Sequence, residues 1–228
     1  SHLECFCAAG ELEHFSKAAE RLHMTQPALS ASIRDNIAIV GMDQFALKNF
    51  LVLGSKEKQY VDQQIQALQY FKYVDMPVKR VFFPLHKAMD GFMSDDQYDK
   101  LYWKPLKKIM MALIDMGVTP FIYTEGPYNT RLDHLMDVPK GKVVYMFEKV
   151  DMKKAKETVG QVACICGNLP TATLMYGTID QIKDETKRIL DIGAPGGGFI
   201  MDTSIVLDKC PRENLHAMFD TTLEYGKY

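Results

Sequence analysis

The chain has 228 residues, of which 47% are hydrophobic and 25% are charged, a balance typical of a soluble globular protein with one or two domains. Its formal net charge of −2 gives no overall attraction to nucleic acid or to anionic membranes. The five cysteines form no regular framework, which argues against a secreted disulfide scaffold. No apolar run approaches the roughly 18 residues that span a bilayer, and no signal peptide is expected, so we expect a cytoplasmic protein without membrane contact.

The first part of the chain, residues 3–34, is predicted to form short helices. Thr25 is a suitable N-cap for one of them, and Pro27 falls in its first turn, where a missing N–H costs nothing. Two short helices joined by a tight turn make a helix-turn-helix, in which the amino-terminal residues of the second helix enter the DNA major groove. Because Gln, Ser and Thr suit base edges and Arg suits phosphates, the candidate DNA-binding residues are Thr25, Gln26, Ser30 and Arg34.

A specific sequence pattern accompanies these helices between Phe15 and Arg34. Ala-Ala-x-x-Leu, beginning at Ala18, is followed by Thr-Gln-Pro-Ala-Leu-Ser, beginning at Thr25, and this string resembles the helix-turn-helix of LysR-type transcription regulators. The resemblance implies a dimeric DNA-binding regulator. The next residues depart from that family, because residues 35–42 form a strand-like apolar run where a wing and a long dimerisation helix would follow. The alternative is a helical hairpin that packs onto the rest of the chain.

From residue 81 onward, short apolar strands alternate with helices. Strands are predicted at residues 81–83, 118–123, 143–147, 162–166 and 198–201. Helices are predicted at residues 96–116, 130–136, 152–159, 179–192 and 212–225, after an earlier one at 61–74. Pro105 should interrupt the helix at 96–116, while Gly117 and Gly160 should follow helix ends. Continuous apolar strands that alternate with amphipathic helices predict a parallel sheet with right-handed crossovers.

The number of strand–helix units limits the architecture. Five units follow residue 81, whereas a closed (β/α)8 barrel needs eight. The predicted fold class is therefore α/β, a partial (β/α)8 TIM barrel of about five βα units preceded by a short helix-turn-helix-like helical segment. The predicted domains are residues 1–35 as the helix-turn-helix-like segment, 36–80 as a connecting segment with one helix, and 81–228 as the half barrel. Such a half barrel either pairs with a second copy in a homodimer or belongs to a fragment or fusion.

Polar side chains follow the predicted strands at the point where each strand ends. Active sites of (β/α)8 barrels gather at the carboxyl ends of the strands, so we expect these loops to meet on one face. The candidates from the five loops are His86, Lys87, Glu125, Glu148, Asp151, Asn168, Asp202 and Ser204. Glu125 has the side chain of a general acid, a general base or a metal ligand, with a salt bridge to Arg131 or to a nearby Lys as the alternative. Gly126, Gly167 and the run Gly196-Gly197-Gly198 are expected to let the backbone approach a ligand, with a simple turn as the alternative for the run.

Two cysteines stand two residues apart on a predicted strand, at Cys164 and Cys166. We expect their thiols to point to opposite faces of the sheet, with Cys164 in the core and Cys166 at the mouth of the barrel. In that arrangement the two thiols would not hold one metal ion together.

Six short motifs after residue 83 resemble the uroporphyrinogen decarboxylase superfamily in order and spacing. They are Pro-Leu-His-Lys-Ala-Met-Asp-Gly-Phe-Met-Ser at 84–94, Asp-Met-Lys-Lys-Ala-Lys at 151–156, Gly-Asn-Leu-Pro at 167–170, Gly-Thr at 177–178, Gly-Gly-Gly-Phe-Ile at 196–200 and Pro-Arg-Glu-Asn-Leu at 211–215. The superfamily contains the tetrapyrrole decarboxylase and the corrinoid-dependent methyltransferases, and the first motif looks more like the methyltransferase-like branch. The resemblance implies a tetrapyrrole or corrinoid-linked substrate at the carboxyl face of the barrel, and a corrinoid protein as partner.

The chain departs from both branches at their best-known site residues. Zinc-dependent methyltransferases carry His-x-Cys-Gly after one strand, where this chain has Tyr123-Thr124-Glu125-Gly126, and their later Cys corresponds to Ser204. Zinc is therefore not expected, and a corrinoid is the cofactor that the resemblance allows. The resemblance assigns catalytic positions to Glu125, Tyr123, Glu148 and Asp151, and substrate-binding positions to His86, Lys87, Asn168, Asp202 and Ser204. A truncated or fused pseudo-enzyme without activity is the further alternative.

Overall fold

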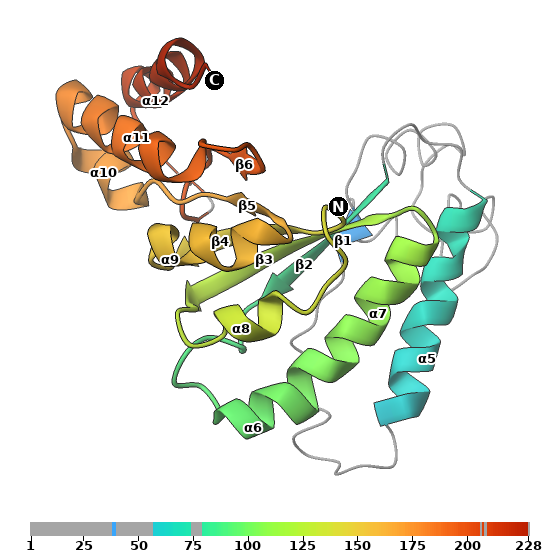
Figure 1. Cartoon of the computed structure of the whole chain (residues 1–228). Helices are drawn as coiled ribbons and strands as arrows, with labels where there is room; N and C mark the ends of the chain where they lie inside the picture. The colour runs from blue at the N-terminus through green and yellow to red at the C-terminus, as the bar shows by residue number, and fades with distance from the viewer. Residues whose placement is uncertain (1–37, 40–56, 74–78, 206, 208, 228) are drawn as a thin grey trace. The chain divides into compact units, whose positions relative to one another are not determined.

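The computed structural model describes residues 38–39, 57–73, 79–205, 207 and 209–227 (Figure 1). The described chain divides into two compact units. One unit contains the described residues up to Pro84 together with Lys104–Phe121, and the other contains Leu85–Trp103 and the chain from Ile122 onward. The predicted helix-turn-helix, with Thr25, Gln26, Ser30 and Arg34, lies outside the described residues.

Strands that are consecutive in the chain are also neighbours in the sheet. The strands are β1 (Ala38–Ile39), β2 (Arg80–Leu85), β3 (Thr119–Pro127), β4 (Val144–Lys149), β5 (Cys164–Cys166) and β6 (Phe199–Ile200), in the order β1-β2-β3-β4-β5-β6. Pairing is parallel, with Val144 opposite Cys164 and Ile165 opposite Phe199. Because each strand from β2 to β6 is followed by helix, the prediction of an α/β partial barrel with five βα units is confirmed.

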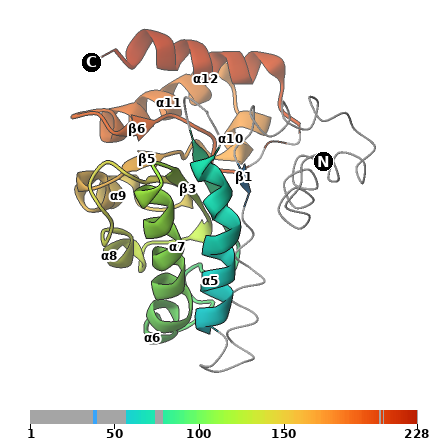
Figure 2. The ribbon, with the colours of Figure 1, turned by 90° about the vertical axis from the view of Figure 1, so that its right-hand side faces the viewer.

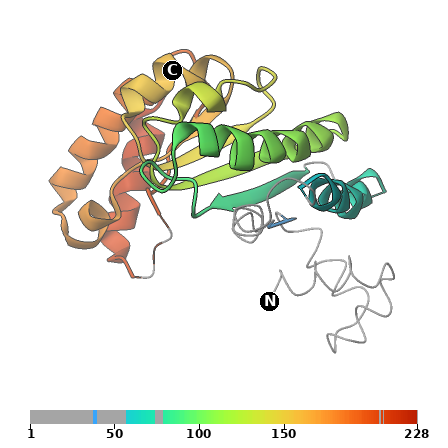
Figure 3. The ribbon, with the colours of Figure 1, turned by 90° about the horizontal axis from the view of Figure 1, so that it is seen from below.

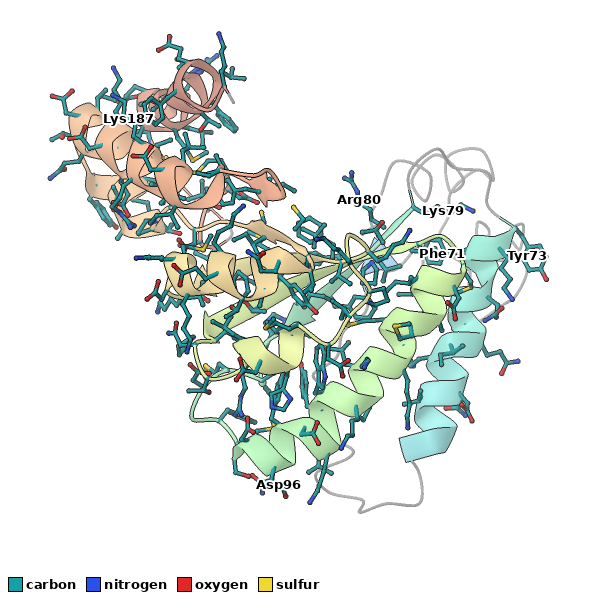
Figure 4. All side chains as sticks on the ribbon, in the orientation of Figure 1. Phe71, Tyr73, Lys79, Arg80, Asp96 and Lys187 are labelled. Atoms are coloured by element: carbon teal, nitrogen blue, oxygen red, sulfur yellow. The ribbon has the colours of Figure 1, made fainter. Side chains whose placement is uncertain are left out.

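Two helices lie side by side in the first unit, α5 (Glu57–Leu68) and α7 (Lys104–Asp115) (Figures 2 and 3). A 3-10 turn, η1 (Gln69–Lys72), continues α5, so the helix predicted at 61–74 is present but begins and ends earlier. The side chain of Lys79, before β2, donates a hydrogen bond to the carbonyl of Phe71 in η1 at 2.9 Å (Figure 4). This contact ties the end of η1 to the start of the strand.

The helix predicted at 96–116 is interrupted, as Pro105 led us to expect. It consists of α6 (Asp95–Gln97), the π-helical segment η2 (Tyr98–Trp103) and α7. Pro105 is the second residue of α7, where it has no N–H to bond the preceding turn, and the π turn lies directly before it. Gly117 follows the end of α7 with φ of +74°, a conformation that glycine adopts without strain.

The second unit has a hydrophobic core that is shared by the three helices that follow β5. These are α10 (Thr171–Tyr176), α11 (Ile179–Gly193) and α12 (Arg212–Tyr225), and the core that they share is Leu169, Leu174, Ile182, Ile189, Ala217 and Met218. The earlier helices are α8 (Leu132–Leu135) and α9 (Met152–Glu157). Helix α10 was not predicted, and Gly160 lies inside a 3-10 turn, η3 (Val159–Gln161), and not behind a helix end. Among the described helices, none has the length and apolarity to cross a membrane.

The glycine run at 196–198 lies at the opposite end of the strand from the expected ligand face. It connects α11 to the beginning of β6, so the expectation that it approaches a ligand at the carboxyl ends of the strands is wrong. All three glycines have φ between +67° and +76°. The ammonium of Lys156 donates hydrogen bonds to the carbonyls of Gly193 and Gly197, each at 2.6 Å. The run therefore forms a tight turn whose carbonyls hold a lysine from α9.

Candidate functional site

The loop after β2 and the end of β3 bring two predicted site residues into direct contact. His86, the first residue after β2, is hydrogen-bonded through Nδ1 to the carboxylate of Glu125. The two side chains are 43% and 37% exposed, so the pair is accessible to a ligand. Arg131, the expected salt-bridge partner of Glu125, binds Asp95 with Nη1 at 2.9 Å. The alternative pairing of Glu125 with Arg131 is therefore wrong.

Glu148, near the end of β4, connects β4 to the part of β3 that carries Glu125. Its carboxylate accepts the backbone N–H of Gly126 at 2.7 Å, and its side chain is only 12% exposed. Burial raises the pKa of Tyr123 to about 12, and the negative charge of Glu148 contributes to that rise. The phenol of Tyr123 therefore stays protonated at neutral pH. These four predicted site residues, His86, Tyr123, Glu125 and Glu148, gather at the ends of β2, β3 and β4.

An open pocket of about 620 Å³ lies beside the ends of β4, β5 and β6. Four predicted site residues line it: Glu148, Asp151, Asn168 and Ser204. The pocket also has basic side chains on its wall, from Lys149, Lys153 and Arg188. Because Glu148 both lines this pocket and binds the backbone next to Glu125, it connects the two groups of candidate residues. Polar groups from the ends of several strands thus share one region, as expected for this architecture.

Asp151 is the N-cap of α9 as well as a pocket residue. Its carboxylate accepts the backbone N–H groups of Lys153 and Lys154 at 3.0 and 3.1 Å. Its own N–H donates to the side-chain oxygen of Asn129 at 2.8 Å. A side-chain oxygen at an N-cap satisfies helix N–H groups that have no partner within the helix. Asp151 therefore orders the loop that forms one wall of the pocket, whatever its chemical role.

Asn168 and Ser204 are held by the loops that follow β5 and β6. The amide of Asn168 donates to the carbonyl of Val150 at 3.4 Å, and the peptide bond between Gly167 and Asn168 is cis. The hydroxyl of Ser204 accepts the backbone N–H of Thr171, at the start of α10, at 3.2 Å. Lys87, by contrast, is half-buried in the turn after β2 and does not line the pocket.

The two cysteines of β5 lie on the same face of the sheet. The expectation that they point to opposite faces is wrong, because residues two apart on a strand share a face. Cys164 is half-buried and Cys166 is buried, the reverse of the expected order. The thiol of Cys166 donates to the Asp202 carboxylate at 3.5 Å, and burial, together with the charge of Asp202, raises the pKa of that thiol. Cys166 is therefore a neutral thiol at the end of β5 that fixes a predicted substrate-binding carboxylate.

A network of polar contacts that the sequence did not predict joins the loop after β2 to the loop after β3. The carboxylate of Asp90 accepts the backbone N–H of Thr130 at 3.2 Å and its hydroxyl at 2.7 Å. The N–H of Asp90 donates to the carbonyl of Pro127 at 2.8 Å. Arg131 donates to the carbonyl of Met93 at 2.6 Å. The Asp-Gly-Phe-Met-Ser motif at 90–94 is the sequence feature that could have indicated this network, because its aspartate, Asp90, holds the loop that carries His86.

Arg131 is the most deeply buried cation of this network, with 2% of its surface exposed. Its guanidinium lies 4.4 Å from the centre of the Tyr98 ring. Asp95 accepts from Arg131 and also from His134 at 3.0 Å. The hydrogen bond from His134, followed by those from Arg131, lowers the pKa of Asp95 against the opposing effect of burial. The network thus fixes α6 to α8 beside the candidate site.

The residues at the positions of the zinc ligands do not fit zinc. Tyr123, Glu125 and Ser204 replace the His and Cys side chains that the metal prefers. The carboxylate of Glu125 is bonded to His86, and the hydroxyl of Ser204 is bonded at the start of α10. In the part of the chain that the structure describes, no three His, Cys, Asp or Glu side chains are grouped to hold a metal ion.

A parallel sheet in which consecutive strands are neighbours, with a helix after each strand from β2 to β6, is the architecture of a partial (β/α)8 barrel. Within this class, the family described as uroporphyrinogen decarboxylase (URO-D) matches residues 59–225. The chain belongs to the uroporphyrinogen decarboxylase family. A second family, the bacterial regulatory helix-turn-helix proteins of the lysR family, matches residues 1–41.

Two curated relatives are methylcobamide:CoM methyltransferases. The chain is 29% identical over 133 residues to MtbA of Methanosarcina acetivorans and 28% identical over 129 residues to MtbA of Methanosarcina mazei. Each match covers 56% of this chain and 37% of the relative, so the chain spans well under half of each methyltransferase in these alignments. A solved structure of a methyltransferase from Methanosarcina mazei has the same fold, with a TM-score of 0.63 at 18% identity over 92% of this chain and 67% of that chain.

Proposed function

We propose that this chain takes part in methyl transfer between a corrinoid and a thiol acceptor, at the region formed by the ends of β2 to β6. The family membership supports a methyltransferase-type activity, and the names of two relatives state that they act on methylcobamide and CoM. The observation that carries the proposal is the position of Glu148, which lines the pocket and also binds the backbone beside Glu125.

The proposed role of the His86–Glu125 pair is to take the proton of the acceptor thiol. A bound methylcorrinoid would supply the methyl group and would keep the electron pair of the bond that breaks, so the residues of this chain would have to take up the proton that the thiol loses as its sulfur gains the methyl group. A carboxylate bonded to an imidazole is a suitable general base for this proton, because the imidazole can accept the proton while the carboxylate stabilises the positive charge that forms on the ring. Glu125 of this pair lies on β3, where the chain has Tyr123-Thr124-Glu125-Gly126 in place of the His-x-Cys-Gly motif, so we propose that acid–base activation of the thiol takes the place of activation by a metal.

The other residues of the region would bind and orient the substrates. Tyr123 keeps its proton, so it can donate a hydrogen bond to an anionic group. Asn168 offers an amide on the pocket wall, and Lys153 and Arg188 give that wall positive charge. The buried Glu148 keeps Gly126, and with it the adjacent Glu125, in place through its hydrogen bond.

The test is a spectral titration of methylcobalamin with the purified protein, followed by addition of coenzyme M. We expect a change in the corrinoid spectrum on binding and loss of the methyl–cobalt absorbance after the thiol is added. Glu125→Gln and His86→Gln should keep the binding change and lose at least tenfold in turnover, a loss typical of a removed general base. Glu157→Gln, at an exposed carboxylate of α9, is the matched control and should behave as the wild type. No spectral change at saturating protein would exclude corrinoid binding and leave the pseudo-enzyme alternative.

A second candidate function rests on the match of residues 1–41 to lysR-type helix-turn-helix proteins. Under this proposal Thr25, Gln26 and Ser30 would contact bases and Arg34 a phosphate. A gel-shift experiment at low salt with wild type and Arg34→Ala tests it. Weaker retardation by the variant supports DNA binding, and equal retardation removes the recognition-helix role.

A further inference from the structure

Met89, in the loop after β2, packs against β3 directly beside Glu125. A Cβ built on Gly126, the residue after Glu125, would lie 2.7 Å from the sulfur of Met89 and 3.1 Å from its Cβ. Non-bonded carbon atoms rest about 3.5–4.0 Å apart, so Met89 already fills the space that a side chain at position 126 would take. The close approach of the backbone that this glycine permits is therefore to Met89, from the neighbouring loop.

Gly126 is held by two contacts of different kinds. Its N–H donates to the carboxylate of Glu148, from β4, at 2.7 Å, and its Cα lies against Met89. Gly126 is buried and has a φ of +83°, a conformation that glycine adopts without strain. Because Glu125 immediately precedes Gly126 in the chain, these two contacts fix the backbone from which the Glu125 carboxylate extends.

The loop that carries Met89 also carries His86, three residues earlier. Its backbone is tied to the end of β3, because the N–H of Asp90 donates to the carbonyl of Pro127 at 2.8 Å. The N–H of Phe92 donates to the carbonyl of Met89 at 3.2 Å and closes a turn. In the sequence, Met89 therefore stands between the imidazole and the point at which the loop is tied to β3. Its half-buried side chain is an apolar contact between the loop and the strand at this position.

We propose that Met89 is a positioning residue for the His86–Glu125 pair. Its packing on Gly126 sets the separation between the loop that carries the imidazole and the strand that carries the carboxylate. A hydrogen bond weakens steeply when its donor and acceptor move out of line. A displacement of about 1 Å at a reacting group can lower a rate about 100-fold. The role of the pair as a general base rests on the proposed function, whereas the effect of Met89 on the geometry of the pair does not.

Proton NMR of the full chain tests the positioning without any corrinoid. In the wild type, the imidazole proton that is hydrogen-bonded to the Glu125 carboxylate should give a resonance far downfield, and its shift in Glu125→Gln assigns it. Met89→Ala should broaden or remove this resonance, whereas Met89→Leu, which keeps nearly the same volume, should retain it. Met175→Ala is the matched control, because Met175 is also half-buried but lies on α10. An unchanged resonance in Met89→Ala would overturn the proposal.

Turnover of methylcobalamin with coenzyme M gives a second test of Met89. Met89→Ala should lower kcat about tenfold and leave the KM for methylcobalamin within about twofold of the wild type, because the residues that would contact the substrate remain. Met89→Leu should keep kcat near the wild-type value. A wild type that turns over no methylcobalamin excludes the proposed function, and the NMR result then decides the positioning by itself.

A double-variant cycle tests the contact between Met89 and Gly126 directly. Gly126→Ala places a methyl group against the sulfur of Met89 and should also lower kcat. In the double variant with Met89→Ala, that methyl group occupies part of the space that the shortened side chain leaves. The loss in kcat should therefore be smaller than the product of the two single losses. Losses that simply multiply would show that the two residues act separately and would contradict the proposal.

Discussion

The carboxylate of Glu148 accepts the backbone N–H of Gly126 at 2.7 Å and thereby fixes the position of β3 at which Glu125 meets His86. The charge of Glu148 also acts on Tyr123, whose pKa rises mainly through burial and further through that charge. We predict that Glu148→Gln lowers the pKa of Tyr123 from about 12, because removing a nearby negative charge favours the phenolate. Ultraviolet titration of the variant against the same variant with Tyr123→Phe measures the shift. An unchanged Tyr123 titration would show that the two groups do not interact.

Arg131 should contribute far more to stability than an exposed arginine. Its replacement by Met removes hydrogen bonds to Met93 and Asp95 and the contact with the Tyr98 ring, so we predict a loss of about 3 kcal/mol in the free energy of unfolding. Arg188→Met is the control. The side chain of Arg188, which pairs with Glu185, is more than half exposed. We therefore predict that its replacement changes the free energy of unfolding by less than about 1 kcal/mol. Urea denaturation measures both, and equal losses would contradict the structural role of Arg131.

Two glycines with positive φ should respond differently to a methyl group. A Cβ on Gly167 would lie 2.7 Å from the carbonyl oxygen of Phe147, whereas a Cβ on Gly141 meets nothing within 4 Å. Gly141→Ala therefore introduces backbone strain alone and should lower the free energy of unfolding by about 1 kcal/mol. Gly167→Ala adds a clash with the backbone of β4 and should cost about 3 kcal/mol in thermal or chemical unfolding. A smaller loss at Gly167 than at Gly141 would show that β4 and β5 are not in close contact there.

The cysteines should differ in reactivity toward a thiol reagent. Burial, with the charge of Asp202, raises the pKa of the Cys166 thiol, so little thiolate forms at mildly alkaline pH. We predict that Cys210, which is partly exposed, is labelled by iodoacetamide well before Cys166 in the native protein. Peptide mapping by mass spectrometry gives the two rates, and labelling after unfolding in urea provides the control in which both react equally. Asp202→Asn should speed the labelling of Cys166.

Acid should weaken the network around Asp95. The pKa of Asp95 is lowered in the folded chain, first by the hydrogen bond with His134, so the unfolded chain binds more protons in acid. The stability that this carboxylate contributes is present above its ordinary pKa and is lost as the pH falls through the lower, folded value. We predict that wild type is more stable than Asp95→Asn at neutral pH and that the difference disappears in acid. Thermal melts from neutral to acidic pH measure this, and a constant difference would contradict the assignment.

Much of the fold could be predicted from the sequence, because buried parallel strands and amphipathic helices leave strong periodic patterns. Helix α12 begins and ends where the spacing placed it, and α11 differs by one residue. Helix α10 was missed because its six residues begin with the weak helix formers Thr171 and Thr173 and have no side-chain N-cap. The glycine run at 196–198 was assigned to the wrong end of the barrel, although it precedes the strand predicted at 198–201 and a loop that precedes a strand lies at the amino end of that strand.

The sequence predicts which residues belong to the candidate site better than it predicts the contacts between them. Strand ends identify His86, Glu125, Glu148 and Asn168, because the carboxyl ends of parallel strands meet at one edge. The partners were not predictable, since contacts such as Arg131 with Met93 join residues that are far apart in the sequence. The prediction for the thiols of β5 was wrong because Cys164 and Cys166 are two residues apart, and side chains two apart on a strand point to the same face.

The contacts of Asp90 have a consequence for recombining members of this family. Asp90 belongs to the segment that carries His86, but its hydrogen-bond partners, Pro127 and Thr130, belong to the segment that follows Glu125. A chimera that imports only one of these segments from a relative would separate the carboxylate from its partners and release the imidazole from its position. The two segments depend on each other through these contacts, so loop exchange between relatives should transfer them together.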